Sequence, residues 1–301
     1  MKRLILLSVF GVIIFLIFVV IKNEQNSTLV QQNADGAIEI ACEPIASNYN
    51  PDNFTTVIQG EVFTETLVLE GEQWNNTLIE DCSFPDIDGE GILLRDVENV
   101  VIHDCTFENI NGQAAIRGSI TGGTKGVIID GNDISSTTEN GITFGQRAAD
   151  GVDHQNLVIK NNLISNTGLE ESGGKSHAIY VQAQDVQVLN NSIQGIRDGN
   201  GISIRSSGVV KCNKITGISK TTKPGIRYYS DHQRGATNRL LIKNNQVLGE
   251  GIGINLFKPV ARYDGLSTMA HVVESFKIIE NDALIEIDNR YLSEGFSVEL
   301  E

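Results

Sequence analysis

The chain has 301 residues and a formal net charge of −15. This balance argues against a general nucleic-acid surface, because such surfaces depend on clustered Lys and Arg side chains that neutralise phosphates. Aromatic residues make up 6% of the chain, which has 30 glycines and 5 prolines. That composition favours short strands and tight turns over a helical bundle.

Near the N-terminus, Lys2 and Arg3 precede an apolar run from Leu4 to Ile21, and a polar stretch follows. Such a run is typical of a signal peptide or a membrane anchor. Its end has no small-x-small cleavage site, which favours an uncleaved anchor with an exported body, and cleavage would instead give a secreted protein. We expect an anchor or signal segment at 1–22, a polar linker and N-terminal cap at 23–54, and one folded domain at 55–301.

One short pattern recurs through the body: apolar, any, apolar, two polar residues, Asn or Cys, any, apolar. Examples are VIIDGNDI at 127–134, LVIKNNLI at 157–164, VQVLNNSI at 186–193 and LLIKNNQV at 240–247. The sixth position is small and polar throughout, and its residues are Cys82, Cys105, Asn132, Asn162, Asn191, Asn213, Asn245 and Asn281. These positions recur about every 22 to 36 residues, which indicates solenoid coils with loops of variable length.

A second pattern, a small residue followed by Ile, alternates with the first. It begins at Gly91, Ala115, Gly141, Ala178, Gly201, Gly225 and Gly253. The alternation of apolar and polar residues around each Ile marks a strand with one buried face. Both strands recur once per coil and can stack on their own copies, so the sequence predicts an all-β parallel β-helix, preceded by a transmembrane or signal helix.

With these repeats the chain resembles the pectate-lyase-like superfamily of right-handed parallel β-helices, over roughly residues 55 to 285. The resemblance implies the fold. It does not choose a function, because that superfamily includes polysaccharide lyases, glycoside hydrolases, uronate epimerases, adhesins and tail-spike proteins.

Inward asparagines at one corner can pass amide hydrogen bonds from coil to coil, so we interpret them as structural. Cys82 and Cys105 occupy the same corner in the first two coils. Their Cα atoms would lie about 4.8 Å apart, which permits either a disulfide or two packed thiols. Cys42 could compete for either partner, and Cys212 is expected to face outward without one.

If Ile at the second position of the small-Ile strand points inward, the third and fifth positions point outward. We expect these positions to form an exposed face. The third positions are Leu93, Arg117, Thr143, Tyr180, Ser203, Arg227 and Asn255, and the fifth are Arg95, Ser119, Gly145, Gln182, Arg205, Tyr229 and Phe257. In the later coils this face is rich in Tyr, Arg and amide side chains, although the whole protein is acidic.

Loops beside this face differ in length, since Asn191 lies 12 positions after Ile179 but Asn162 lies 20 positions after Ile142. Long loops on both sides of a flat face are expected to form a groove. They carry further polar side chains, namely Arg147, Asp153, His154, His177, Asp231, His232, Lys258 and Arg262.

A groove of this composition suits an anionic polysaccharide, because Arg pairs with carboxylates and aromatic rings offer flat contact area. β-Elimination from a uronate requires neutralising its carboxylate, removing the neighbouring proton and protonating the leaving oxygen. The predicted catalytic residues are His177, Tyr180, Arg205, Arg227, Tyr229, Asp231 and His232. The predicted substrate-binding residues are Arg117, Arg147, Gln182, Asn255, Lys258 and Arg262.

Other functions remain open. The same groove could serve a non-catalytic polysaccharide-binding or surface-attachment module, and each Arg could simply form an ion pair between coils. A uronate epimerase needs similar groups, but Asp153-His154 lacks the Pro of the Asp-Pro-His motif of known β-helix epimerases. Hydrolysis ranks lower because the outward positions supply no paired carboxylates.

We expect no cofactor. Calcium could bind an outer strip formed by Asp81, Asp104 and Asp130, although a solvated acidic face is the simpler interpretation. Apart from an acidic polysaccharide, the expected partner is the membrane, through the N-terminal segment.

Overall fold

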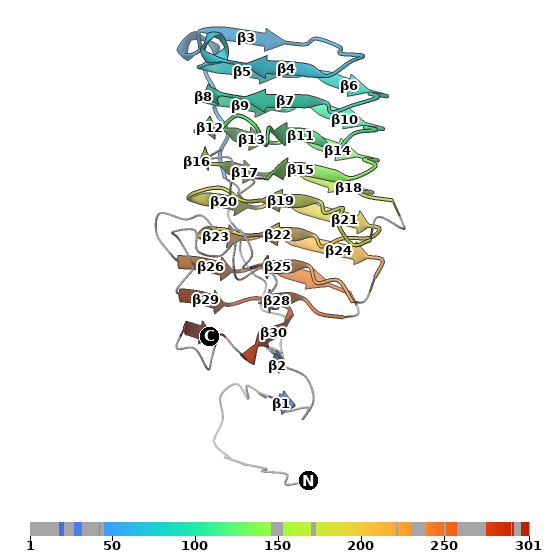
Figure 1. The fold of residues 1–301 in the computed structure, drawn as a ribbon, viewed down its shortest axis with the longest axis vertical. Helices are drawn as coiled ribbons and strands as arrows, with labels where there is room; N and C mark the ends of the chain where they lie inside the picture. The colour runs from blue at the N-terminus through green and yellow to red at the C-terminus, as the bar shows by residue number, and fades with distance from the viewer. Residues whose placement is uncertain are drawn as a thin grey trace.

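The structure, a computed structural model, describes residues 18–20, 27–31, 42, 45–145, 153–169, 173–220, 222–229, 239–249, 251–257, 275–289, 291 and 296–300. These residues build a parallel β-helix, in which successive coils stack from β3 at one end to β31 at the other (Figure 1). Most coils contribute one strand to each of three long sheets.

The first sheet carries the small-Ile strands and has 11 described strands. In spatial order they are β4 (Leu67–Glu70), β7 (Ile92–Arg95), β11 (Ala114–Gly118), β15 (Asn140–Phe144), β19 (Ile179–Val181), β22 (Ile202–Ile204), β25 (Ile226–Tyr229), β28 (Ile254–Phe257), β30 (Leu284–Asp288), β2 (Ser27–Gln31) and β1 (Phe18–Val20). The strands from β4 to β30 pair in parallel, whereas β2 pairs antiparallel with β30 and with β1.

The second sheet carries the strands that lead into the Asn or Cys position. Its described strands are β3 (Thr56–Gln59), β5 (Thr77–Glu80), β9 (Val100–His103), β13 (Ile128–Asp130), β17 (Val158–Lys160), β20 (Val186–Leu189), β23 (Gly208–Lys211), β26 (Arg239–Lys243), β29 (Ser275–Ile279) and β31 (Ser297–Leu300).

The third sheet follows that position. Its described strands are β6 (Ser83–Pro85), β10 (Thr106–Glu108), β14 (Asp133–Ser135), β18 (Leu163–Ser165), β21 (Ser192–Ile196), β24 (Lys214–Ile218) and β27 (Gln246–Leu248). A short fourth sheet joins β8 (Val97–Glu98), β12 (Thr124–Lys125) and β16 (His154–Gln155), and two 3-10 turns, η1 (Pro51–Asn53) and η2 (Glu72–Trp74), lie in the first coils.

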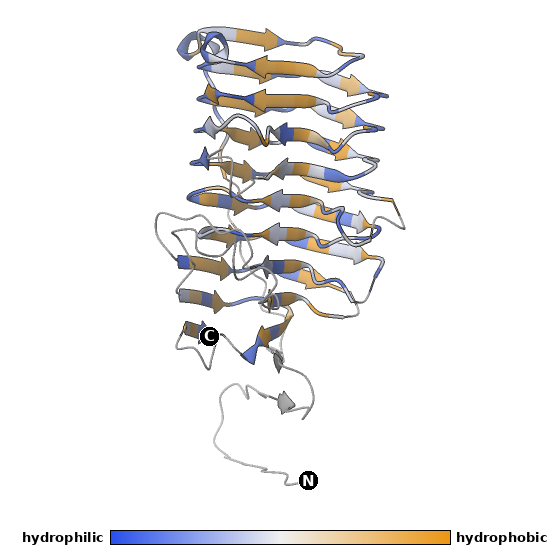
Figure 2. Cartoon of the chain, viewed as in Figure 1, coloured by the Kyte–Doolittle hydropathy of each residue, from blue (hydrophilic) through white to orange (hydrophobic). Residues whose placement is uncertain are grey.

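The interior of the stack is apolar, as the alternation predicted, and many of the strands that enclose it carry apolar residues (Figure 2). The Ile of every small-Ile pair is fully buried, and so are Ile159 and Val188 on the second sheet. Phe84 stacks on Phe63 and Phe107 of the neighbouring coils, with ring centroids 4.9 and 4.6 Å apart. One coil cannot cover its own apolar faces, so burial depends on stacking.

The predicted asparagine ladder is confirmed. Nδ2 of Asn132 donates to Oδ1 of Asn162 at 2.9 Å, and the same bond repeats from coil to coil as far as Asn281. At the other end of the ladder, the backbone N–H of Cys105 donates to Oδ1 of Asn132 at 3.0 Å. The amides therefore satisfy one another inside the stack, where an unpaired amide would be costly.

The residue before each ladder position has a positive φ. These residues are Asp81, Asp104, Gly131, Asn161, Asn190, Cys212, Asn244 and Glu280. Asp, Asn and Gly tolerate this left-handed conformation better than most residues do, so Asp81 and Asp104 have a backbone role in the turn. Asp130 lies one position earlier and is fully buried. The three aspartates therefore do not form the solvated acidic strip that the sequence suggested.

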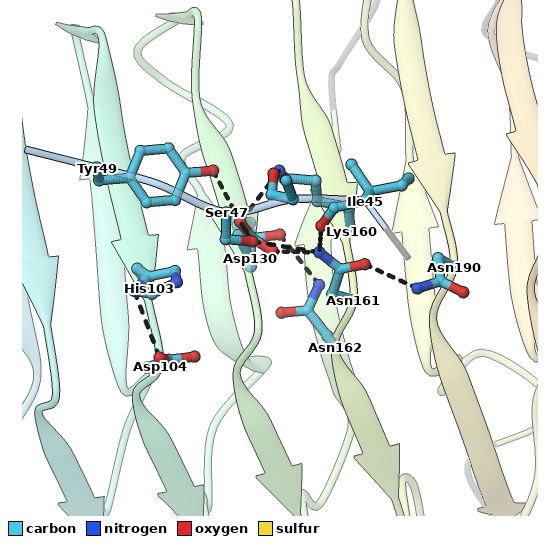
Figure 3. A network of polar contacts seen from close by, with 12 residues as sticks. Ile45, Ser47, Tyr49, His103, Asp104, Asp130, Lys160, Asn161, Asn162 and Asn190 are labelled. Atoms are coloured by element: carbon cyan, nitrogen blue, oxygen red, sulfur yellow. Dashed lines mark hydrogen bonds and ion pairs between the residues drawn. The ribbon is translucent and has the colours of Figure 1, made fainter. Parts of the chain in front are cut away.

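Asp130 is buried because residues 45–50 cross the outside of the second sheet; we call this segment, together with Cys42, the strap (Figure 3). Oδ2 of Asp130 accepts hydrogen bonds from the hydroxyls of Ser47 and Tyr49. Lys160, on the next coil, donates from Nζ to a strap carbonyl at 3.0 Å. Burial and the neighbouring Asp130 raise the pKa of Tyr49, so the phenol remains a donor.

The strap is also attached covalently, through a disulfide between Cys42 and Cys212. The expectation that Cys212 lacks a partner is therefore wrong, because the strap brings a residue 170 positions away to its coil. Cys82 and Cys105 are buried free thiols, which decides between the two alternatives for that pair. Burial raises the pKa of Cys105 to about 12, so its thiol stays protonated.

The expected membrane segment falls almost entirely outside the described residues. Of the apolar run, the structure describes Phe18–Val20, which form β1. No helix in the described part of the chain is long and apolar enough to span a membrane.

Candidate functional site

A pocket of 370 Å³ lies on the outward side of the first sheet, over β15, β19, β22 and β25. Its volume is at the lower end of the range for ligand pockets. The described lining comprises Asn140, Thr143, Gly174, Lys175, His177, Tyr180, Asn200, Ser203, Arg205, Arg227 and Tyr229. It contains three cationic side chains and no carboxylate.

The side chain of Arg205 lies between two tyrosine rings in this pocket. Its guanidinium carbon lies 4.8 Å from the ring centroid of Tyr180 and 4.5 Å from that of Tyr229. The arrangement follows from register, because β19, β22 and β25 are neighbours (Figure 1). Tyr180 lies on β19, Tyr229 ends β25, and Arg205 directly follows β22 between them. Cation–π contact holds the guanidinium in place between the two rings.

Arg227 is fixed by a chain of polar contacts across the next strands. Its Nε donates to Oδ1 of Asn255 at 2.9 Å, and Nδ2 of Asn255 donates to Oε2 of Glu286 at 2.8 Å. Burial lowers the pKa of Arg227 and Glu286 partly offsets that effect, but an arginine remains charged in proteins. The pocket therefore keeps a positioned positive charge.

His177 is neutral and has a defined tautomer. Its Nδ1 accepts the backbone N–H of Asn200 at 2.9 Å, which requires the ring proton to sit on Nε2. Burial, with Arg205, Lys223 and Arg227 nearby, lowers the pKa of His177 to about 3. Nδ1 is occupied and Nε2 carries a proton, so the imidazole is a hydrogen-bond donor. His177 was predicted as a catalytic residue for proton transfer, and in this state its ring has no nitrogen left to accept a proton.

Asn140 and Asn200 line the pocket but were missed by the sequence reasoning. Oδ1 of Asn140 accepts the backbone N–H of His177 at 2.8 Å, one coil before the contact between Asn200 and His177. All three residues directly precede the small residue of a small-Ile pair. The available signal was the recurrence of Asn, His and Asn at that position. Lys175, two residues before His177, had no comparable signal.

The predicted outward register is correct, but the face is much less exposed than expected. Thr143, Gln182, Ser203 and Asn255 are all at most 9% exposed. For Ser203 the reason is local, because its register partners on the two neighbouring strands are the longer side chains of Tyr180 and Arg227.

Five of the predicted site residues line the pocket: His177, Tyr180, Arg205, Arg227 and Tyr229. Arg117 is not among the lining residues and forms an ion pair with Glu90, so its prediction as a substrate-binding residue is not supported. Gln182 is also outside the lining, and Asn255 acts through Arg227. Arg147, Asp231, His232, Lys258 and Arg262 lie outside the described residues.

His154 was expected in a loop beside the groove, and this is wrong. It begins the short strand β16, is fully buried, and hydrogen-bonds through Nδ1 with the hydroxyl of Thr124 at 2.9 Å. Burial lowers its pKa to about 4, so this imidazole is also neutral. Within the described residues, no group of three or more His, Cys, Asp or Glu side chains is placed to hold a metal ion.

Comparison with family models gives a match over residues 69–247 to the family described as the right handed beta helix region. The curated proteins give no match to this chain.

Proposed function

Since this chain belongs to the right-handed β-helix family, whose fold supports unrelated activities, we propose from its pocket that it binds an acidic, uronate-containing polysaccharide and cleaves it by β-elimination. One observation carries the proposal. Lys175, Arg205 and Arg227 meet in a pocket whose described lining has no carboxylate, in a chain of net charge −15. Cations gathered against the overall charge favour an anionic ligand.

The arginines would bind the uronate carboxylate. A guanidinium presents donors in a planar fork that matches a carboxylate, and negative charge on that carboxylate grows as the neighbouring proton leaves. Arg227 is already oriented by Asn255, so it needs little reorganisation when the ligand arrives. The rings of Tyr180 and Tyr229 add aromatic contact area along their edges, since a face of each already packs against Arg205.

The proton transfers fall to the tyrosines. His177 has one nitrogen occupied and a proton on the other, so it cannot accept the proton that elimination releases. Tyr180 and Tyr229 are the described hydroxyl-bearing aromatic residues of the lining, on either side of Arg205. One, as its phenolate, would remove the proton beside the carboxylate, and the other, as the neutral phenol, would protonate the leaving oxygen.

A binding module without catalysis is the alternative. The observation that favours it is the state of His177, because a neutral, donor-only imidazole leaves the described lining without a histidine base or a carboxylate. The cations and rings of the pocket would then hold the polymer without breaking it.

Incubating the protein with a panel of uronate polymers separates the two functions. A lyase generates unsaturated products that absorb in the ultraviolet, whereas a binding module retains the polymer unchanged. Arg227→Ala should abolish turnover or weaken binding at least about tenfold. Arg117→Ala is the matched control on the same face, since Arg117 is paired with Glu90 outside the pocket. No binding or cleavage of any acidic polymer would overturn the proposal.

We also propose that the protein is exported and membrane-anchored. The disulfide between Cys42 and Cys212 supports an oxidising compartment, where such bonds persist. Cell fractionation with N-terminal sequencing tests this: the full chain should sediment with membranes and keep its first residues. Recovery in the cytoplasmic fraction with reduced cysteines would contradict it.

A further inference from the structure

The side-chain acceptors of Asn140 and His177 form a short second ladder. Each accepts a hydrogen bond from the backbone N–H of the corresponding residue on the next coil. Asn140 accepts from His177, and His177 accepts from Asn200. Continuing this pattern, Oδ1 of Asn200 should accept the N–H of the residue two positions before Ile226, since Ile202 and Ile226 are register partners. That residue is Pro224, which has no N–H.

The second ladder therefore stops at Asn200. The Asn200 side chain belongs to a residue that is 3% exposed, and its Oδ1 has no hydrogen-bond partner in the described structure. Buried acceptors normally have a partner, so this one calls for an explanation. Asn200 also lines the pocket, so a ligand that settles against this lining, next to the enclosed oxygen, can supply the missing donor.

A donor is present on His177, the residue to which the backbone of Asn200 is bonded. The proton of His177 is on Nε2 because Nδ1 accepts from the backbone of Asn200, and no described residue accepts from Nε2. His177 lines the same pocket as Asn200. One acceptor and one donor, on residues joined by a direct hydrogen bond, complement a group that both donates and accepts. A hydroxyl does so and a carboxylate does not.

We propose that Asn200 and His177 form a recognition site for one sugar hydroxyl, and that Pro224 keeps this site open by withholding the N–H that would close it. The proposal rests on the proposed function, because the ligand is the acidic sugar unit whose carboxylate meets Arg205 and Arg227. It adds that the unit must carry an unmodified hydroxyl at the position facing Asn200, so a sugar modified there binds poorly.

Binding of a uronate disaccharide and of its single-deoxy analogues tests the recognition site. Each analogue replaces one hydroxyl by hydrogen and adds no bulk. In the wild-type protein, one analogue should bind about 10- to 100-fold more weakly than the parent, since it leaves both Asn200 and His177 without a partner. In Asn200→Leu that same analogue and the parent should bind within about threefold of each other, while a neutral disaccharide remains excluded.

Pro224→Ala provides the sharper test. Alanine restores a backbone N–H that can bond Oδ1 of Asn200, so the variant should also lose most of the preference for the hydroxyl. In an Asn200→Leu background the same substitution should change nothing further, which isolates the pair in a double-variant cycle. Pro85→Ala, on β6 away from the pocket, controls for the general effect of replacing a proline.

The outcomes are distinct. If the wild-type protein binds uronate disaccharides but no deoxy analogue differs from the parent, the recognition site is refuted and the proposed function stands. If one analogue binds more weakly than the parent, but Asn200→Leu and Pro224→Ala both keep that difference, a different residue binds the hydroxyl and the recognition site is refuted. If the wild-type protein binds no acidic sugar, the proposed function fails and this inference fails with it.

Discussion

Nζ of Lys160 lies 3.2 Å from Oδ2 of Asp130 on the neighbouring coil, and the strap covers both side chains. Asp130 is fully buried and Lys160 is 8% exposed. Water reaches little of the Lys160 side chain and none of Asp130, so the pair and the strap depend on each other.

Replacing Asp130 should therefore destabilise the protein strongly. Asp130→Ala leaves the ammonium of Lys160 without its carboxylate and removes the acceptor for Tyr49, which should lower the free energy of unfolding by about 3–5 kcal/mol. Chemical denaturation measures the change. Glu98→Ala, which breaks an exposed ion pair with Lys125, should cost less than about 1 kcal/mol and serves as the control. Equal effects of the two substitutions would mean that the strap does not bury Asp130 in solution.

The disulfide should contribute to stability through the chain that it closes. A loop of 170 residues corresponds to about 5 kcal/mol in the chain-entropy model, and measured effects are typically 2–4 kcal/mol. We expect reduction to lower the melting temperature of the wild-type protein. The double variant Cys42→Ser, Cys212→Ser should already melt at that lower temperature and should not respond to reductant. A double variant as stable as the oxidised wild type would refute the bond.

The contribution of the asparagine ladder to stability can be measured by comparing two substitutions on and next to β20. Asn191 donates from Nδ2 to Oδ1 of Asn213 and to the carbonyl of Ile159. Asn191→Leu removes this donor and also the Oδ1 that accepts from the backbone N–H and Nδ2 of Asn162. Buried polar groups on both neighbouring coils lose a partner, so unfolding should become easier by at least about 2 kcal/mol. Gln187→Ala alters an exposed side chain on β20 and should change stability by less than about 0.5 kcal/mol. A ladder without energetic value would give similar results for both variants.

The two neutral histidines make stability depend on pH. Burial lowers the pKa of His177 to about 3 and that of His154 to about 4, from the usual 6.5. Below pH 6.5 the unfolded chain takes up protons that the folded chain refuses, so stability is full above that pH and falls as the pH drops toward 4. His177→Gln and His154→Gln should each lose less stability between pH 7 and pH 4 than the wild type does. Parallel curves for wild type and variants would contradict the assigned shifts.

Because His177 stays neutral, it should also leave no trace in a pH profile of turnover. A lyase acting through Tyr180 and Tyr229 should show no limb near pH 6.5 that disappears in His177→Gln. Measuring turnover from pH 5 to 8 in both proteins checks this. A limb that is lost with the substitution would restore His177 as a proton-transfer group.

The parts of the fold that repeat could be predicted from the sequence. Ile142, Ile179 and Ile202 were assigned to the interior by alternation, and the ladder from Asn132 to Asn281 by its recurring position. A repeat imposes the same environment on every copy, so many weak local signals support one register. Tyr180, Arg205 and Tyr229 were placed on one face for the same reason, and the structure brings them together.

Features that occur only once in the chain had no repeated sequence signal to support their prediction. The expected exposure of Gln182 and Asn255 and the expected loop position of His154 were wrong, and the sequence left open whether Arg117 forms an ion pair. Each of these depends on which neighbour covers or pairs with one side chain. Alternation assigns a side chain to the inner or outer face. It carries no information about what lies above that face.

By itself, then, the sequence determined the stacked coils, the inward residues and the composition of the outward face, because periodic patterns reflect contacts made by every coil alike. Only the tertiary structure decided that Cys42 reaches Cys212, that Asp130 is buried beneath the strap and that His177 carries its proton on Nε2. These features arise from single contacts between residues far apart in the chain. Their partners are selected by the path of the folded backbone, which no local pattern records.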